Sequence, residues 1–287
     1  MINVKNFLKS TFDMDVSNIQ QIYGGMMNSS FLYSFENKNY IIYFPTDQAN
    51  KMVDRHLEKC NQLLFYKSAT TSKNIYFDEK SGIKINEYIS GKSLDKIDDY
   101  DLQKIANLFK KVHNSPLLSQ KNYSPFDKLE TFKANLIEFN YQLDKQYKEL
   151  ENFLFKYKEF LTKQKLTLCH NDAQKSNIIR SNNDQYYLID FEFAGNNDPI
   201  YDIATFGNGD VQEGYRLLYA YFLNPSQEEK LRYFLWRIYI SLQWYVVAIY
   251  KDLSGEGLTH KIDFKNVARH FIENAEIAYK EASEIKL

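Results

Sequence analysis

The spacing of apolar positions changes partway along the chain. In the first part apolar residues alternate in short runs, which predicts strands over residues 19–23, 30–35, 40–44, 74–77 and 83–88. Helical spacing in the same part predicts helices over residues 4–12 and 50–66. From Asp98 the period lengthens to about 3.6 residues, which predicts helices over residues 98–113, 129–143, 147–161, 234–250 and 264–282. The pattern therefore predicts a sheet-rich first part followed by a larger helical part.

Two strand-like runs interrupt the helical part, and each ends in polar residues. The first run ends at Cys169 and is followed by His170, Asn171 and Asp172, while the second covers residues 186–189 and is followed by Asp190. Because both runs end where the acids begin, we expect the carboxylates of Asp172 and Asp190 to lie side by side.

Residue types in this stretch point to one kind of chemistry. Asn177 stands five positions after Asp172, which is the spacing that kinase catalytic loops use, and Asp190-Phe191-Glu192 takes the place of their metal-binding Asp-Phe-Gly. Phosphoryl transfer needs a carboxylate to deprotonate the attacking hydroxyl, and carboxylate and amide oxygens to hold Mg²⁺. We expect Asp172 to be the catalytic base, and Asn177, Asp190 and, more weakly, Glu192 to bind the metal.

Composition narrows the class of protein. The net charge is −1 and the sequence has no long run of Lys and Arg, so we expect no nucleic-acid binding. The two cysteines, far apart and without histidines at zinc spacing, indicate neither a disulfide framework nor a structural metal and suit a reducing cytoplasm. The polar N-terminus does not resemble a signal peptide, and residues 234–250 carry Arg237 and Gln243, so we expect a buried helix there and no membrane insertion.

The ordered set of motifs resembles the choline/ethanolamine kinase family, within the aminoglycoside-phosphotransferase-like kinases. The resemblance rests on His170-Asn171-Asp172-x-Gln174-x-x-Asn177, then Asp190-Phe191-Glu192-x-Ala194-Gly195, then Asp202-Ile203-Ala204. It implies an α+β, protein-kinase-like fold with two lobes: a small β-rich nucleotide-binding lobe over residues 1–88 and a larger, mainly helical catalytic and acceptor-binding lobe over residues 89–287. It further implies ATP and Mg²⁺ as cofactors and a small amino alcohol as the acceptor.

The same resemblance assigns nucleotide contacts in the first lobe. Gly24-Gly25-Met26-x-Asn28 is similar to the family's nucleotide loop, so Gly24, Gly25 and Asn28 would cover the phosphates. Glu58 would hold a strand cation from the helix, and backbone groups around Glu87 and Ile89 would meet the adenine edge.

Two positions depart from the family pattern. Met27 stands where the family has Ser or Thr, and Tyr43 stands where its third strand has Lys or Arg. A neutral phenol cannot replace a positive charge near the triphosphate, so we expect Glu58 to pair with Arg55 or Lys59, or to accept from Tyr43. Replacing Tyr43 by Lys is expected to tighten ATP binding.

The acceptor site is predicted from charge and aromatic residues. We expect Asp198 to border it and to offset a substrate cation. A quaternary ammonium is best held by aromatic faces, and where choline kinases have two tryptophans three residues apart, this chain has Trp244 and Val247. Trp244 is the expected cation face, and further faces are sought among Tyr201, Trp236, Tyr239 and Tyr245.

Three functions follow from these residues. The first is phosphorylation of choline. The second is the same transfer to ethanolamine, thiamine, an aminoglycoside or a sugar alcohol, which Val247 favours because a primary ammonium donates hydrogen bonds to Asp198 and needs fewer aromatic walls. The third is a catalytically silent binding protein with a kinase fold, which Tyr43 and Met27 favour.

Overall fold

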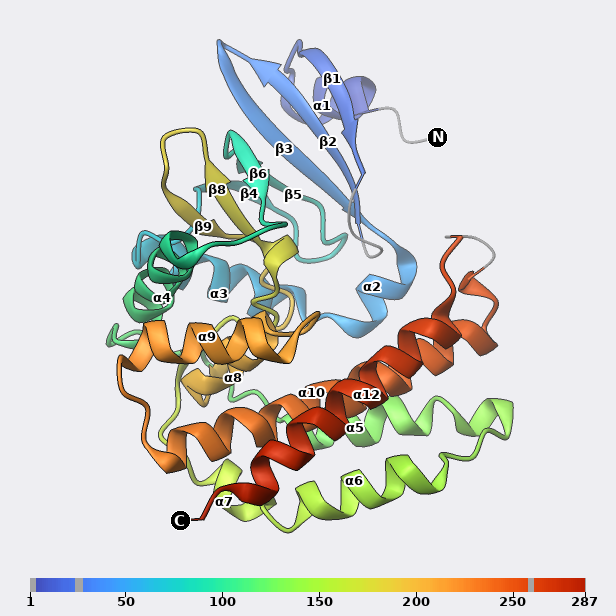
Figure 1. Ribbon diagram of the computed structural model, residues 1–287. Helices are drawn as coiled ribbons and strands as arrows, with labels where there is room; N and C mark the ends of the chain where they lie inside the picture. Colours follow the sequence, from blue (N-terminus) through green and yellow to red (C-terminus); the bar gives the residue numbers. More distant parts are fainter. Residues whose placement is uncertain (1–3, 24–27, 258–260, 287) are drawn as a thin grey trace.

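The computed structural model describes residues 4–23, 28–257 and 261–286. A five-stranded antiparallel sheet in the order β1-β2-β3-β5-β4 lies at one end of the molecule, above a large group of helices (Figure 1). This first lobe consists of α1 (Val4–Phe12), β1 (Ser17–Ile22), β2 (Asn28–Phe35), β3 (Lys38–Pro45), α2 (Asp47–Met52), α3 (Arg55–Lys67), β4 (Asn74–Phe77) and β5 (Lys84–Glu87).

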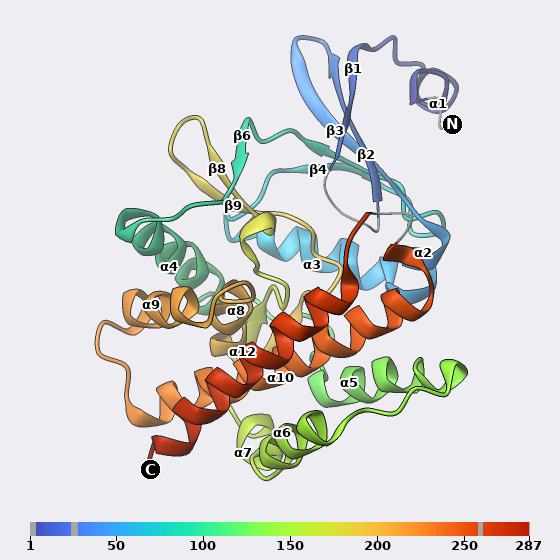
Figure 2. The same cartoon turned by 45° about the vertical axis from the view of Figure 1, so that its right-hand side comes forward.

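The sheet and α1 share a small apolar core. Leu8 of α1 is fully buried with Tyr33 and Ile42 of the sheet. Helix α3 lies between the sheet and the helical part (Figure 2). The single helix predicted over residues 50–66 is wrong, because Val53 is extended and Asp54 accepts a hydrogen bond from the Leu57 N–H at 3.0 Å, which starts a new helix.

Helices dominate the second lobe. Its elements are β6 (Gly91–Ser93), α4 (Asp99–His113), α5 (Pro125–Ala134), η1 (Ile137–Phe139), α6 (Lys145–Phe155), α7 (Lys158–Thr162), β7 (Thr167–Cys169), η2 (Lys175–Asn177), β8 (Ile178–Ser181), β9 (Tyr186–Leu188), β10 (Gly195–Asn197), α8 (Pro199–Phe206), α9 (Val211–Phe222), α10 (Gln227–Leu253) and α12 (Phe264–Glu284). The helix predicted over residues 129–143 is wrong in its second half, because α5 ends at Ala134 and a separate 3-10 turn ends at Asn140, whose φ of 51° is left-handed. The helix predicted over residues 147–161 is interrupted between α6 and α7.

Helix α10 forms the centre of this lobe. Its start is fixed by a capping box between Ser226 and Glu229, and most of its side chains are buried. Helix α12 packs along it, and α5, α6 and α8 contact its other sides (Figures 1 and 2). The predicted two-lobe α+β fold is thus confirmed. No helix in the described part of the chain is long and apolar enough to cross a membrane.

The two strands that carry the acids belong to different small sheets. Strand β7 pairs with β10, whereas β9 pairs with β8. A hydrogen bond joins the two strand ends. His170 follows β7 directly and donates from Nε2 to the carbonyl oxygen of Ile189, which follows β9 directly, at 2.8 Å. Burial lowers the pKa of His170, so the ring is neutral and its Nδ1 accepts from the Asp172 N–H at 3.3 Å.

Candidate active site

Asp202 of α8 anchors the loop that carries Asp172. Its two carboxylate oxygens accept the backbone N–H groups of His170 at 2.8 Å and Asn171 at 2.7 Å. Asn171 has a left-handed φ of 63°, and its side-chain amide donates to the Phe193 carbonyl at 3.0 Å. The loop after β7 is therefore tied both to α8 and to the loop after Asp190.

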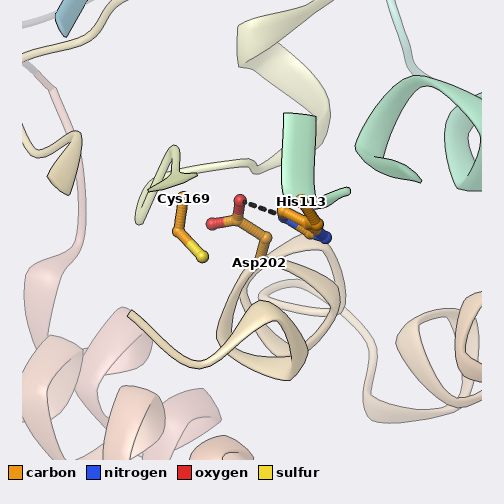
Figure 3. Close-up of side chains that lie close together, drawn as sticks. All are labelled: His113, Cys169 and Asp202. Atoms are coloured by element: carbon orange, nitrogen blue, oxygen red, sulfur yellow. Dashed lines mark hydrogen bonds and ion pairs between the residues drawn. The ribbon is translucent and has the colours of Figure 1, made fainter. Parts of the chain in front are cut away.

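Asp202 also meets a histidine from a distant helix (Figure 3). His113 at the end of α4 lies with Nε2 3.0 Å from Asp202 Oδ2, and its Nδ1 lies 3.1 Å from the Tyr221 hydroxyl. Cys169 lies on the other side of the carboxylate, where burial raises the pKa of its thiol well above the ordinary value. Because hydrogen bonds from His113 and from the His170 and Asn171 N–H groups occupy both Asp202 oxygens, this cluster holds the loop that carries Asp172 in place.

Asp172 lies against two amides of its own loop. Asn177 donates from Nδ2 to Asp172 Oδ2 at 2.8 Å and to the Asp172 carbonyl at 2.9 Å, and Gln174 donates to Oδ2 at 3.3 Å. Burial, followed by the charge of Asp190, raises the pKa of Asp172 well above its usual range. A carboxylate that holds a proton this readily is suited to take one from an attacking hydroxyl.

The oxygens around Asp190 suit a divalent cation. Asp190 has a left-handed φ of 68°, and its Oδ1 is buried without a hydrogen-bond partner in the described part of the chain, although 39% of the side chain stays exposed. The NH₂ group of Asn177 donates both of its hydrogen bonds to Asp172, so the Asn177 Oδ1 remains as an acceptor. Carboxylate and amide oxygens are the ligands that Mg²⁺ prefers, so Asp190 and Asn177 fit this metal.

Glu192 is held by two residues of the first lobe. Its Oε1 lies 3.3 Å from Arg55 Nη1 of α3 and accepts from Asn28 Nδ2 at 3.0 Å at the start of β2. Burial and the charge of Asp190 raise the pKa of Glu192. Glu192 thus joins the start of β2 and α3 to the segment that follows Asp190. Gly24 and Gly25 lie outside the described residues.

A lysine supplies the charge that the sequence seemed to lack at Tyr43. Lys84 on β5 is the ladder partner of Tyr43 on β3, and its Nζ lies 5.0 Å from the centre of the Tyr43 ring. It forms a buried ion pair with Glu58 and lies 3.8 Å from Asp190 Oδ1. Paired residues of neighbouring strands point to the same face, so Lys84 reaches the place that a cation at position 43 would take.

This lysine corrects several expectations. Glu58 pairs with Arg55 at 2.6 Å, as expected, and also with Lys84, whereas Lys59 pairs with Glu79 at 2.8 Å. Burial alone lowers the pKa of Lys84, but the charges of Glu58 and Asp190 raise it above the ordinary value, so the group is an ammonium. Glu58 lies behind Lys84 and positions it.

A group of packed rings connects α3 to both acid-bearing loops. Phe65 of α3 lies 4.6 Å from Phe191 and 5.9 Å from His170, measured between ring centres, and His170 lies 5.2 Å from Phe191. All three side chains are buried. The helix that holds Lys84 through Glu58 is therefore packed on the residues next to Asp172 and Asp190, which fixes the three charged groups relative to one another.

One cavity of about 800 Å³ connects the two lobes through this centre. At one end lie Tyr43, Lys84, Glu87 and Ile89, and the Ile89 backbone groups have no hydrogen-bond partner in the described part of the chain. The middle is lined by the acidic and amide residues, namely Asn28, Asp172, Asn177, Asp190 and Glu192. A long ligand could therefore run from the interlobe segment to Asp172.

The other end of the cavity is aromatic. Trp244 lines it and stacks on Phe271 with 6.2 Å between ring centres, and Tyr201 lines it as well. Trp236, Tyr239 and Tyr245 are almost fully buried, as Tyr201 is, but they are absent from the described lining. Four further rings that the sequence reasoning did not assign to the site line the cavity: Tyr123, Phe132, Phe193 and Tyr250. Phe193 is the unassigned position within the Asp190 motif, and Tyr250 belongs to a helix that was expected to be buried.

Asp198 does not lie where the sequence reasoning placed it. Its carboxylate is fully buried, forms an ion pair with Arg232, and accepts a hydrogen bond from Trp236 Nε1 at 2.8 Å. It also caps α8 through the Ile200 N–H at 2.9 Å. It is absent from the described residues that line the cavity. Its charge is neutralised within the core, so it does not border the acceptor end.

Comparisons with known proteins agree with this geometry. Residues 19–230 match the sequence profile described as choline/ethanolamine kinase. Protein LicA of Haemophilus influenzae is 27% identical over 188 residues, which is 63% of this chain and 55% of that protein. The chain thus spans about half the length of this curated relative.

Solved structures resemble nearly the whole chain. The choline kinase LicA from Streptococcus pneumoniae is 26% identical with a TM-score of 0.75, covering 98% of this chain and 97% of that one. The aminoglycoside phosphotransferase APH(4)-Ia, in complex with ADP and hygromycin B, is 14% identical with a TM-score of 0.73, covering 98% and 99% of the two chains, and shows the shared fold alone. With its profile match over most of its length, the chain belongs to the choline/ethanolamine kinase family.

Proposed function

We propose that this protein is an ATP- and Mg²⁺-dependent kinase that phosphorylates the hydroxyl of a small amino alcohol, with choline as the first acceptor. One observation carries the proposal. Asp172, Asn177 and Asp190 line the middle of a single cavity that has a lysine at one end and aromatic rings at the other. A nucleotide and a small cationic alcohol would each meet suitable groups there.

Asp172 is the residue that accepts the hydroxyl proton in this proposal. As the acceptor oxygen forms its bond to the γ-phosphorus, the bond from that phosphorus to the β–γ bridging oxygen breaks, and ADP leaves with the electron pair. The proton passes from the acceptor hydroxyl to the Asp172 carboxylate, whose raised pKa suits it to hold the proton. Gln174 and Asn177 keep Oδ2 in place by hydrogen bonds.

Asp190 and Asn177 are the residues that would hold Mg²⁺, with Glu192 assisting from its contacts with Arg55 and Asn28. When bound, the metal neutralises charge on the phosphates. Lys84, whose Nζ lies 3.8 Å from Asp190 Oδ1, adds a further positive charge beside them and is kept in position by Glu58. Gly24, Gly25 and Asn28 would cover the phosphates, and the backbone of Glu87 and Ile89 would meet the adenine.

The aromatic end of the cavity supports a cationic acceptor. Trp244 would offer its ring face to the ammonium, contributing about 0.5–2 kcal/mol, and Tyr201, which is 1% exposed, would border the acceptor. Choline is the first choice because a choline kinase matches nearly the whole chain. Ethanolamine is the second, because Val247 lines the cavity in place of a further aromatic side chain. The case for a silent binding protein weakens, since Lys84 supplies the cation that Tyr43 does not.

The test is product formation from Mg²⁺-ATP and either choline or ethanolamine, followed by mass spectrometry of the phosphorylated alcohol. Wild-type protein is expected to form the product, and Asp172→Ala is expected to lose at least about 10²-fold in kcat. Titration calorimetry with Mg²⁺-ATP runs beside it. Nucleotide binding without any transfer to the tested alcohols would overturn the amino-alcohol assignment, and undetectable binding at millimolar nucleotide would overturn the kinase assignment.

A further inference from the structure

The aromatic end of the cavity contains one polar side chain whose orientation is decided by proton counting. Gln243 belongs to the face of α10 that lines the cavity together with Trp244 and Val247. Its side chain is 8% exposed. Its Oε1 lies 2.7 Å from the Tyr239 hydroxyl oxygen, no hydrogen bond joins its Nε2 to another described residue, and the side chain lines the cavity.

The Tyr239 hydroxyl has one proton but lies close to two oxygen atoms that could accept it. It is within hydrogen-bond distance of the Pro125 carbonyl oxygen and of the Gln243 amide. The Pro125 oxygen belongs to the backbone and can only accept, so the proton of Tyr239 goes to it. A second oxygen facing Tyr239 would then have no proton between itself and the hydroxyl oxygen, which is unfavourable in a buried place.

A half-turn of the amide removes this conflict without moving any other atom. Gln243 then donates from Nε2 to the Tyr239 oxygen, and its carbonyl oxygen Oε1 faces the cavity. We propose that Gln243 is a specificity-determining residue, which presents this oxygen to the acceptor's nitrogen and so raises the activity on amino alcohols that carry N–H groups relative to the activity on choline. This inference rests on the proposed function and concerns the same cavity.

The chemistry of the two classes of acceptor explains the selection. A primary, secondary or tertiary ammonium donates an N–H to a carbonyl oxygen, whereas a quaternary ammonium has no N–H to donate. Trp244 attracts both kinds of cation through its ring face. At Val247 the cavity has a small apolar wall where a further ring would favour the methylated cation. Gln243 and Val247 therefore both raise the activity on acceptors with an N–H group relative to the activity on choline.

The experiment uses a graded set of acceptors: choline, N,N-dimethylethanolamine, N-methylethanolamine and ethanolamine. For each, kcat/KM is measured with wild-type protein, Gln243→Leu and Tyr239→Phe, and acceptor binding is measured separately by thermal shift with Mg²⁺-ADP. Gln243→Leu is expected to lower the ratio of ethanolamine to choline kcat/KM about 10-fold or more, because a hydrogen bond to a charged group is lost. Tyr239→Phe leaves the amide free to turn, so a smaller fall in the ratio is expected.

The outcomes separate this inference from the proposed function. An unchanged ratio in Gln243→Leu, or an equal loss for all four acceptors, overturns the role of Gln243 and leaves the kinase assignment intact. A wild-type protein that phosphorylates none of the acceptors overturns the proposed function. In that case the thermal shifts still decide the inference: selective loss of ethanolamine binding in Gln243→Leu supports it, and equal shifts contradict it.

Discussion

Replacing Lys84 by Met removes the charge that takes the place of a third-strand cation. The side chain is 4% exposed, and its Nζ pairs with Glu58 and lies 3.8 Å from Asp190 Oδ1. Methionine keeps the length and apolar stem of the side chain but cannot bind a phosphate oxygen. Two effects are therefore expected, one on catalysis and one on stability.

The structure sets the size of both effects. Losing a positioned donor at the transferring phosphoryl group costs about 3–4 kcal/mol, which lowers kcat/KM for ATP about 10²–10³-fold. Removing one partner of a buried ion pair costs about 3–5 kcal/mol. Here Glu58 keeps Arg55 at 2.6 Å as a second partner. We therefore expect a smaller loss of about 1–3 kcal/mol in the free energy of unfolding, seen as a lower Tm.

The assay is steady-state kinetics with varied ATP, with calorimetric unfolding of the same samples. Tyr43→Phe is the matched control, because it keeps the ring beside Lys84 and is expected to change little. Tyr43→Lys in the Lys84→Met background returns an ammonium from the facing position and is expected to recover part of the activity. In wild-type protein the same substitution puts two cations on paired positions, so tighter ATP binding is no longer expected. A Lys84→Met enzyme with kcat/KM within about twofold of wild type would refute the reasoning.

Three other substitutions distinguish residues that act in catalysis from residues that hold the site in place. Burial and the charge of Asp190 raise the pKa of Asp172, so its ionisation costs stability as pH rises from the unfolded-state pKa of about 3.9 through the higher folded-state pKa. Asp172→Asn should therefore raise Tm at pH 7 in calorimetry while lowering kcat, and an unchanged or lower Tm argues against this. Asp198→Asn removes the main partner of Arg232 and leaves only Glu228 at 3.8 Å, so we expect a loss of up to about 3–5 kcal/mol on urea unfolding with an unchanged KM for the acceptor. A raised KM with normal stability would return Asp198 to the acceptor site. His113→Leu should lower kcat without changing KM for ATP, because Asp202, which anchors the loop carrying Asp172, loses its contact with His113. His113→Gln keeps a hydrogen-bond donor towards Asp202 and should recover part of the lost kcat. Equal kcat in wild type and both variants excludes this role.

The sequence was most informative where function depends on neighbours along the chain. Asp172 and Asn177 lie in one loop, and their spacing alone predicted that they act together. Asp190 followed from an apolar run with an acid at its end. These features are local, so a sequence pattern contains them. The fold class followed from the change in hydrophobic period for the same reason.

Other features depend on how distant segments pair, and the sequence could not reveal them. Lys84 lies in a strand that was predicted, but its function depends on the register that places it opposite Tyr43. Asp198 was misplaced because its partner Arg232 comes from α10, thirty-four residues along the chain. Tyr123 reaches the cavity from the segment before α5, where no periodic pattern marks it.

Single-turnover transfer of the γ-phosphoryl group tests the central claim most directly. Protein in excess over radiolabelled Mg²⁺-ATP is mixed with choline or ethanolamine, and labelled product is followed for wild type, Asp172→Asn and Asp190→Asn. We expect wild type to transfer the label to the alcohol, and both variants to lose at least about 10²-fold in rate. Transfer at equal rates in all three proteins would contradict the account, because two carboxylates at the centre of the cavity would then be irrelevant to the reaction.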